Sequence, residues 1–259
     1  MTSVNFLEGI VSAKRRELCL KKEKLPFERM KKALNPSEKD FRAAIEGKQK
    51  ISLVAEIKVA SPLAGTLLQG ISPVEIAALY AKYADAVSFV SDKAYFKGNI
   101  ADLPKVSSVS GLPVLMKDFI IDEYQILEAR FFEADAVLLI ASLLKTETLR
   151  DFISTAERLS MHCVVEVHSR SELDKALEAG AEIIGINNRN LSDFSVDLNV
   201  TKNLAPFVPK KKVVISESGF SSRHDVEKFR GDIDAILVGT AILKAQDREA
   251  TLKELSGRQ

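Results

Sequence analysis

Residues 54–62 read Val-Ala-Glu-Ile-Lys-Val-Ala-Ser-Pro, an apolar run that carries a carboxylate and an ammonium before it breaks at Ser-Pro. Side chains of equal parity face the same way in a strand, so Glu56 and Lys58 project together from its C-terminal end. Burying two such ions carries a large desolvation cost, which Val or Leu would avoid. The stretch therefore predicts either a structural ion pair or a functional site at the end of a strand.

The same rhythm of apolar run, polar turn and helix signal repeats along the rest of the chain. Continuous apolar runs without polar alternation are typical of a parallel sheet that is covered on both faces. Ser72-Pro73 with Glu75 predicts a capped helix start, and Ser169 with Glu172 predicts a second capping box. Each step is therefore expected to be a right-handed βα unit. The runs occupy residues 52–55, 86–90, 113–116, 136–140, 163–167, 183–187, 213–216 and 235–239.

Eight βα units favour a closed barrel over an open, doubly wound sheet. An open sheet would carry phosphate-binding glycines after its first strand, but no strand end here matches GxGxxG or a P-loop. Before the first strand, Leu7, Ile10 and Leu18 have the spacing of an amphipathic helix. The sequence thus predicts an α/β fold, a single (β/α)8 TIM barrel over residues 51–259, with a helical N-terminal extension over residues 1–50.

Composition excludes several classes of function. A formal net charge of +1 gives no electrostatic basis for binding nucleic acid. No apolar run approaches the roughly 20 residues that span a bilayer, and the N-terminus lacks a signal-peptide pattern, so we expect a cytoplasmic protein without a membrane partner. The two cysteines and three histidines have no metal-type spacing. We therefore expect neither a metal nor an organic cofactor.

A TIM barrel makes a further prediction, because its active-site residues lie at the C-terminal ends of the strands. Six of the predicted strands end in polar or glycine residues of useful chemistry. Structural ion pairs do not readily explain such convergence on one rim, so an active site is favoured. These residues are Glu56, Lys58, Lys117, Asp118, Glu166, Asn187, Glu217, Ser218, Gly219, Gly239 and Thr240.

The residues at this rim suit acid–base chemistry on a phosphorylated sugar. Ser218-Gly219 and Gly239-Thr240 follow the seventh and eighth strands, the usual phosphate position in this fold. A desolvated lysine has a lowered pKa, whereas the pKa of a desolvated glutamate rises toward the working pH. A single lysine could equally form a Schiff base, so an aldolase stays open beside a phosphosugar isomerase and a non-catalytic, metabolite-binding barrel.

Motifs in all eight strands resemble the indole-3-glycerol phosphate synthase family. The resemblance implies ring closure of 1-(2-carboxyphenylamino)-1-deoxyribulose 5-phosphate to indole-3-glycerol phosphate, with loss of carbon dioxide and water, in tryptophan biosynthesis. It implies a carboxy-lyase without cofactors, whose partner is a small phosphorylated substrate. We expect a monomer, and docking with other enzymes of the pathway stays open. The resembling segments are 53–58 with 61–62, 88–98, 115–119, 138–141, 164–168, 185–191, 216–219 and 237–240.

The resemblance also implies a role for each site residue. Lys117 is expected to protonate the ketone, Lys58 to hold the substrate carboxylate and to serve as a second proton donor, and Glu166 with Glu56 to act as bases. The catalytic set it implies is Glu56, Lys58, Lys117, Glu166, Asn187 and Ser218. The substrate-binding set comprises carboxylate ligands, phosphate ligands with the supporting Glu217, and an apolar wall around the anthranilate ring. Its members are Ser61, Arg189, Glu217, Gly219, Gly239, Thr240, Phe96, Phe119, Leu138, Ile140 and Leu237.

Three positions depart from the family pattern. Val59 stands where a basic or small polar residue is usual, and Ser91 where threonine is usual. Leu63 replaces a hydroxyl residue after Ser-Pro, which removes a potential hydrogen bond and adds bulk to the first loop. These departures predict altered substrate affinity or loop closure, and they leave a changed substrate open as an alternative.

Overall fold

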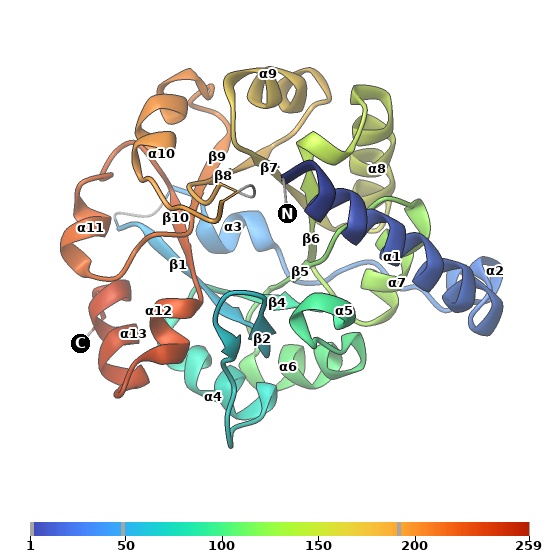
Figure 1. Ribbon diagram of the computed structural model, residues 1–259, viewed down its shortest axis with the longest axis horizontal. Coiled ribbons are helices and arrows are strands. Elements are labelled where there is room, and N and C mark those ends of the chain that lie inside the picture. The colour runs from blue at the N-terminus through green and yellow to red at the C-terminus, as the bar shows by residue number, and fades with distance from the viewer. Residues whose placement is uncertain (1–2, 48–49, 191–192, 259) are drawn as a thin grey trace.

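The computed structural model describes residues 3–47, 50–190 and 193–258; Leu191, which ends one of the resembling segments, lies outside them. Eight parallel strands close into a barrel in the order β1-β10-β9-β8-β7-β6-β5-β4 (Figure 1). The TIM-barrel prediction is confirmed, and every predicted apolar run coincides with a strand. The strands are β1 (Ser52–Ile57), β4 (Ala86–Val90), β5 (Val114–Lys117), β6 (Ala136–Ile140), β7 (His162–Val167), β8 (Ile183–Asn187), β9 (Val213–Glu217) and β10 (Ala235–Val238).

Helices surround the barrel and follow its strands. The capping box at Ser72 is formed as predicted, with Glu75 bonding back to the Ser72 N–H. The second box is only half formed, because Glu172 accepts the N–H of His168 instead of that of Ser169. The helices after the first strand are α4 (Pro73–Tyr83), α5 (Lys93–Phe96), α6 (Leu103–Ser110), α7 (Glu123–Phe131), α8 (Thr146–Arg158), α9 (Arg170–Glu178), α10 (Asn199–Leu204), α11 (Arg223–Glu227), α12 (Thr240–Lys244) and α13 (Arg248–Ser256).

Apolar side chains form a core inside the barrel. Phe41 and Ile45 of α3 (Phe41–Ile45) are fully buried in the same cluster as the inward-facing strand residues, and α3 contacts β1 and β4. The helix therefore extends the interior core with its apolar side chains. The strand members of this cluster are Val54, Ala86, Leu115, Ala136, Leu138, Ile140, Val164, Ile183, Val213, Ile215, Ala235 and Leu237.

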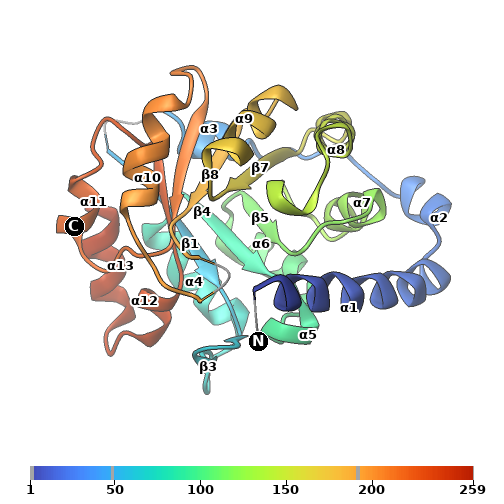
Figure 2. The same cartoon turned by 45° about the horizontal axis from the view of Figure 1, so that its top comes forward.

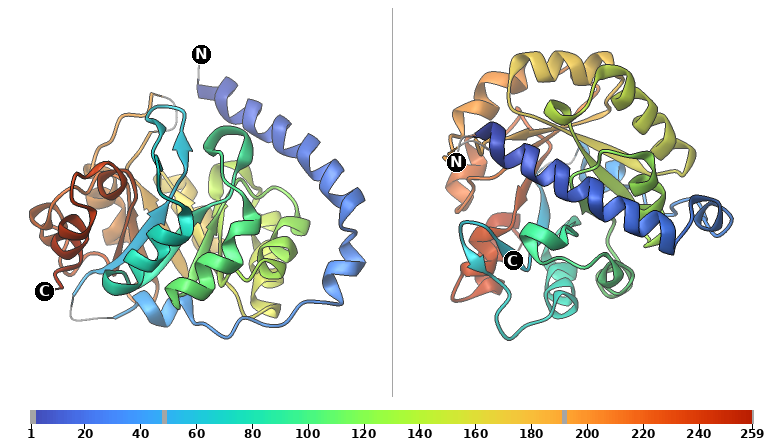
Figure 3. Two further views of the ribbon diagram at one scale, coloured as in Figure 1. Left: turned by 90° about the horizontal axis from the view of Figure 1, so that it is seen from below. Right: turned by 45° about the vertical axis from the view of Figure 1, so that its right-hand side comes forward.

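Three helices precede β1, namely α1 (Ser3–Lys24), α2 (Phe27–Lys31) and α3. Figure 2 shows α1 beside α5. In the left view of Figure 3 the chain runs from α1 at the top, past α2, to α3 at the bottom of the barrel. A cluster of Leu18, Met30, Tyr124 and Leu127 packs α1 and α2 against α7. Within the described ranges, no helix is both long enough and apolar enough to cross a membrane.

The first loop contains a short hairpin that the sequence did not predict. Strands β2 (Ala60–Ser61) and β3 (Gly65–Thr66) pair antiparallel directly after β1. The turn between them exposes Leu63, of which 62% is accessible to solvent. The Ser-Pro break therefore starts a hairpin beside the mouth of the barrel.

Candidate active site

A layer of charged side chains lies directly above the apolar core. Alternate strands of the barrel each contribute one residue to it, two positions after an apolar core residue of the same strand. Because the parity is equal, the charged side chains face inward as the apolar ones do. All four residues are largely buried, and three of them carry carboxylates. The layer consists of Glu56 on β1, Lys117 on β5, Glu166 on β7 and Glu217 on β9.

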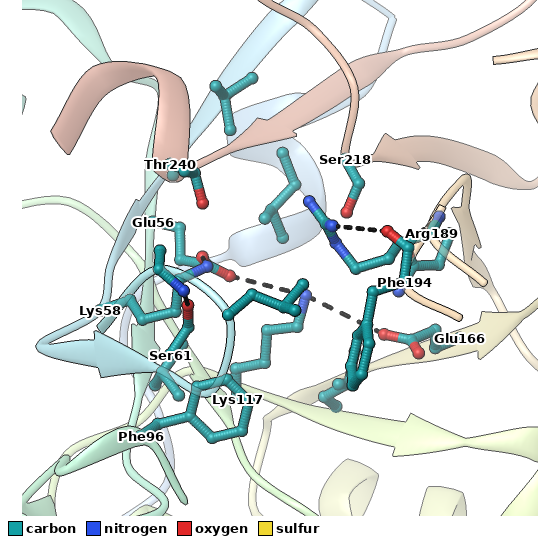
Figure 4. A pocket seen from close by; sticks show the side chains of 18 of the residues that line it. Glu56, Lys58, Ser61, Phe96, Lys117, Glu166, Arg189, Phe194, Ser218 and Thr240 are labelled. Atoms are coloured by element: carbon teal, nitrogen blue, oxygen red, sulfur yellow. Dashed lines mark hydrogen bonds and ion pairs between the residues drawn. The ribbon is translucent and has the colours of Figure 1, made fainter. Parts of the chain in front are cut away.

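Lys117 is the centre of this layer (Figure 4). Its Nζ lies 2.6 Å from Glu217 Oε2, 3.7 Å from Glu56 Oε2 and 3.9 Å from Glu166 Oε2. Burial by itself would lower the pKa of Lys117, but the three carboxylates outweigh it and raise that pKa. The expectation that a desolvated lysine here has a lowered pKa is therefore wrong for Lys117, which keeps its proton.

Glu217 lies below the cavity and is completely buried. Burial raises its pKa to about 7; the Lys117 ammonium opposes the rise and the Glu166 charge adds to it. Among the described residues its Oε1 has no hydrogen-bond partner. A Cβ at Gly185 of the neighbouring strand would come within 2.3 Å of this oxygen, so any larger residue there would displace the carboxylate. Glu217 can therefore gain or lose a proton near neutral pH while in contact with Lys117.

Glu56 and Lys58 project to the same side of β1, as their parity predicts, and they form a hydrogen-bonded ion pair. Burial favours the neutral form of Glu56, but Lys58 and Lys117 together lower its pKa, so it stays ionised. Gly239 makes room for this carboxylate, since a Cβ there would lie 2.4 Å from Glu56 Oε1. Gly185 on β8 and Gly239 after β10 thus leave room for two carboxylates of the charged layer.

His168 lies beside the site residue Glu166, and the sequence reasoning did not single it out. Its Nε2 lies 3.5 Å from Glu166 Oε1 and its Nδ1 lies 3.4 Å from Glu172 Oε2. Burial by itself lowers the pKa of His168, but Glu172 and Glu166 raise it. The signal was the Glu-x-His pair at the end of β7, which has the same parity spacing as Glu56 and Lys58. Glu166 therefore lies between an imidazole and the Lys117 ammonium.

The loop after β8 forms another wall. Asn187 Oδ1 accepts the Arg189 N–H at 3.0 Å, and Arg189 Nη1 donates to the Phe194 carbonyl at 3.1 Å. Phe194 has a positive φ of 61°, and Figure 4 shows its ring among the side chains that line the cavity. Sequence reasoning missed Phe194, because an aromatic residue in a polar loop does not reveal which way the loop folds.

The turn after β9 and the start of α12 form the remaining wall. Ser218 and Gly219 both have positive φ, 68° and 100°. A Cβ at Gly219 would lie 2.8 Å from Val196 Cγ1, so the turn requires glycine. Gly239 directly precedes α12, whose first N–H groups have no partner inside the helix. Figure 4 shows Ser218 and Thr240 on the side of the cavity away from Phe96.

One cavity of about 390 Å³ unites these walls. Every predicted site residue lines it except Glu217, which lies below. Leu7 of α1 and Leu63 of the hairpin also line the cavity, and neither was predicted as a site residue. Their positions depend on how α1 and the hairpin pack, which no local pattern reveals.

Solved structures with similar backbones establish the fold independently. A Streptococcus mutans protein named KGPDC has a TM-score of 0.63 at 12% identity, over 80% of this chain and 96% of its own. A 3-hexulose-6-phosphate synthase has the same TM-score at 18% identity, over 80% of this chain and 99% of its own. At such identities the likeness concerns the fold alone.

A barrel mouth with an ammonium among carboxylates and with glycine turns after its last two strands defines an acid–base enzyme of the (β/α)8 class. Sequence comparison gives the family. The family model described as indole-3-glycerol phosphate synthase matches residues 7–255. The synthase of Dehalococcoides mccartyi strain CBDB1 is 40% identical over 258 residues, 96% of this chain and 99% of its own. This chain belongs to the indole-3-glycerol phosphate synthase family.

A further relative contains a similar sequence as part of a longer chain. The Yersinia pestis protein named "Tryptophan biosynthesis protein TrpCF" is 39% identical over 249 residues. The alignment covers 96% of this chain but only 52% of that protein. The Chlorobium phaeovibrioides synthase is 40% identical over 244 residues, 95% of its own length.

Proposed function

We propose that the charged layer closes the indole ring of 1-(2-carboxyphenylamino)-1-deoxyribulose 5-phosphate. Family membership gives the overall reaction, that of a carboxy-lyase of tryptophan biosynthesis which forms indole-3-glycerol phosphate. The observation that carries the assignment of roles is Lys117, a protonated amine held among three carboxylates at the floor of the cavity. We further propose that the chain consists of a helical extension over residues 1–50 and a catalytic barrel over residues 51–259.

In the first step the ring carbon that bears the carboxylate attacks the ketone carbon. Lys117 donates its proton to the ketone oxygen, and its fixed ammonium stabilises the charge that develops there without reorganisation. Carbon dioxide then leaves, and its bonding electrons restore the aromatic ring. Glu217, 2.6 Å from Lys117 and with a pKa of about 7, is the nearest group that could return a proton to Lys117. This contact supports a role at Lys117 in place of the predicted support of the phosphate loop.

In the second step water leaves, and the five-membered ring becomes aromatic. The new hydroxyl departs with a proton, while a carboxylate removes a proton from the adjacent methylene carbon. Glu166 and Glu56 both face the cavity and can serve as this base. His168 next to Glu166 is a positioning group for that carboxylate, because the ring lies between Glu166 and Glu172.

Two anion sites would hold the flexible substrate in a reactive conformation. Ser218, Gly219, Gly239 and Thr240 are proposed to bind the phosphate, whereas Arg189 with Asn187 and Ser61 would bind the carboxylate. Holding both ends converts the encounter of ring and ketone into an oriented, unimolecular step.

Lys58 follows β1, which pairs directly with β10, the strand before Gly239. Arg189 follows β8, which pairs directly with β9, the strand before Ser218. Strand order therefore does not separate the two anion sites, and we propose that Lys58 holds the substrate carboxylate, as the resemblance implies.

The anthranilate ring would occupy the apolar part of the cavity. Phe96 and Phe119 have ring centroids 6.2 Å apart at an interplanar angle of 33°, and both line the cavity. Leu138, Ile140 and Leu237, which line the cavity from β6 and β10, are proposed to complete the wall. Such contacts bury apolar surface and fix the plane of the ring against Lys117.

The three departures from the family pattern fit this function. Val59 has the opposite parity to Glu56 and Lys58 and packs against the core outside the strands. It does not line the cavity, so the site does not need a polar side chain at this position. Ser91 Oγ donates to Asp118 Oδ2 at 2.8 Å, a bond that a threonine hydroxyl would also make. Ser61 Oγ accepts the Ala64 N–H across the hairpin turn, so the turn holds without a hydroxyl at Leu63.

A Schiff-base aldolase is disfavoured by the same geometry. A nucleophilic amine must be neutral, but the carboxylates around Lys117 stabilise its protonated form. An isomerase would need one acid and one base and would leave most of the charged layer unused. A measurement of turnover distinguishes the proposed synthase from a non-catalytic barrel.

Indole fluorescence provides the test. The chain contains no tryptophan, so a rise of indole emission during incubation with the carboxyphenylamino-deoxyribulose phosphate would report product against little protein background. We expect this rise with the unaltered chain and its absence with Lys117→Ala. A flat trace from unaltered protein that still binds the substrate would overturn the proposal and favour a binding barrel.

A further inference from the structure

Lys14 of α1 is a lysine buried among carboxylates outside the charged layer. Only 2% of it is exposed. Its Nζ lies 2.8 Å from Asp118 Oδ1, 2.9 Å from Asp92 Oδ2 and 3.0 Å from Glu17 Oε2. Burial by itself lowers the pKa of Lys14, but Asp118 and Asp92 raise it, so the ammonium is charged. A charge buried this deeply on a surface helix requires its partners, because removing one leaves the others uncompensated.

Asp92 organises the loop after β4. Its Oδ1 accepts the N–H groups of Tyr95 at 2.7 Å and Phe96 at 3.3 Å, which caps α5. The loop doubles back tightly at Gly98, where a Cβ would lie 2.2 Å from the Val90 carbonyl oxygen. The aspartate that pairs with Lys14 thus fixes the backbone of Phe96, a residue of the apolar wall.

Asp118 organises the loop after β5. Its Oδ1 accepts the Phe119 N–H at 2.7 Å, and its Oδ2 accepts the hydroxyl of Ser91 from the neighbouring loop. Asp118 directly follows Lys117. One ammonium on α1 therefore joins the loops that carry Phe96 and Phe119, next to the proton donor.

We propose that Lys14 is a positioning residue of the active site, through which the N-terminal helix holds the aromatic wall in register with Lys117. The inference rests on the proposed function and deepens it. Leu7 lies seven residues earlier, on the same face of α1, and lines the cavity. The helix extension is therefore a structural part of the site, reaching it through Lys14 and Leu7.

Lys21 provides a matched control on the same helix face. It lies seven residues after Lys14 and also forms ion pairs, with Glu17 at 2.9 Å and Glu128 at 3.0 Å. Glu128 belongs to α7, on the outside of the barrel, so Lys21 docks the helix without contacting either loop. A change at Lys21 weakens the docking of the helix while Lys14 keeps both loop aspartates, Asp92 and Asp118.

The experiment compares kcat, KM and the thermal midpoint of Lys14→Met and Lys21→Met. For Lys14→Met we expect kcat to fall about tenfold or more, because the displaced aromatic wall would misplace the anthranilate ring of the substrate relative to Lys117. KM should change less than about threefold, since the phosphate site across the cavity is intact. Lys21→Met should keep both constants within about twofold, although its midpoint falls.

A second variant covers the case in which Lys14→Met does not fold. Asp118→Asn retains an oxygen for the Phe119 N–H and polar contact with Ser91, while it removes the charge that faces Lys14. We expect its kcat to fall about threefold to tenfold with KM nearly unchanged.

The outcomes separate the two proposals. An unaltered chain that forms no indole product overturns both. An active chain in which Lys14→Met and Lys21→Met lose the same kcat, or in which the whole loss lies in KM, overturns the positioning role alone. An unchanged kcat in Asp118→Asn also overturns it.

Discussion

Two layers of side chains inside the barrel come from the same four strands and differ completely in chemistry. The lower layer is apolar and fully buried, and the upper layer, two residues further along each strand, carries three carboxylates and one ammonium. Each strand thus changes from core to active site within one pleat. The pairs are Val54 and Glu56, Leu115 and Lys117, Val164 and Glu166, and Ile215 and Glu217.

Residues of the lower layer stabilise the fold, whereas residues of the upper layer serve the reaction. Buried methyl groups lower the free energy of the folded state, by roughly 25 cal/mol for each Å² of apolar surface removed from water. Buried ion pairs recover little net energy, and apolar side chains of similar volume often replace them without loss. The upper layer is therefore expected to cost stability and to be retained for its chemistry.

The largest effect is expected for Lys117→Met, which places an apolar side chain, like those of the lower layer, in the upper layer. Loss of the acid and of its fixed charge should reduce kcat about a thousandfold or more. Steady-state indole fluorescence measures this. A residual kcat within tenfold of the unaltered value would mean that another group protonates the ketone.

A smaller loss of activity is expected for Glu166→Gln. The amide keeps the shape of the side chain but cannot accept a proton, so kcat should fall about a hundredfold with little change in KM. Val164→Ala on the same strand is the control; it should unfold at lower urea concentration and keep kcat within about twofold. Equal losses of kcat in the two variants would abolish the distinction between the layers.

On β9, changes at Ile215 and at Glu217 are expected to differ in how they affect the pH dependence of the unfolding free energy. Ile215→Val should lower the free energy of unfolding by about 1 kcal/mol at every pH, with kcat retained. Because the pKa of Glu217 is raised to about 7 in the folded protein, the folded state binds more protons than the unfolded state between the unfolded pKa and about pH 7. Its contribution to stability is therefore lost as pH rises through that window.

Glu217→Gln should remove this part of the pH dependence, whereas Ile215→Val should leave it unchanged. Urea unfolding of both variants at a series of pH values between 5 and 8 provides the measurement. A Glu217→Gln profile that is as steep as that of the unaltered chain would show that Glu217 does not titrate there.

The smallest effect is expected outside both layers, at Leu63 of the exposed hairpin turn. Leu63→Ser restores a hydroxyl and removes an exposed apolar side chain, so stability should change by less than about 0.5 kcal/mol. KM should change by less than about threefold, because the residue touches only the rim of the cavity. A tenfold change in KM would make the hairpin turn a substrate contact.

Sequence patterns predicted the layers better than they predicted their surroundings. Apolar runs and residue parity are local properties, so the strands, the inward direction of Glu56 and Lys58, and the polar residues at the strand ends followed from them. Ser61, Arg189 and the apolar wall of the cavity followed only from the family resemblance. The raised pKa of Lys117 did not follow, because it depends on how many carboxylates from distant strands surround one amine. The contact between Glu217 and Lys117 likewise did not follow, because it joins strands far apart in the sequence.

The contributions of α1 and of the loops could not be predicted for a related reason. Lys14 belongs to a basic run that is typical of a solvated helix face, and only the packing of α1 on the loops after β4 and β5 buries it. Leu7 and Phe194 line the cavity through the same kind of long-range packing. Local periodicity indicates that a helix forms but not which surface it covers.

The most direct test of the difference between the layers is the urea unfolding free energy of Lys117→Met combined with Glu217→Met. The double change replaces the central ion pair with apolar side chains, while Glu56 keeps Lys58 and Glu166 keeps His168 as partners. We predict an inactive protein that is at least as stable at pH 7 as the unaltered chain. A loss of more than about 2 kcal/mol would contradict the account, because the charged layer would then stabilise the fold.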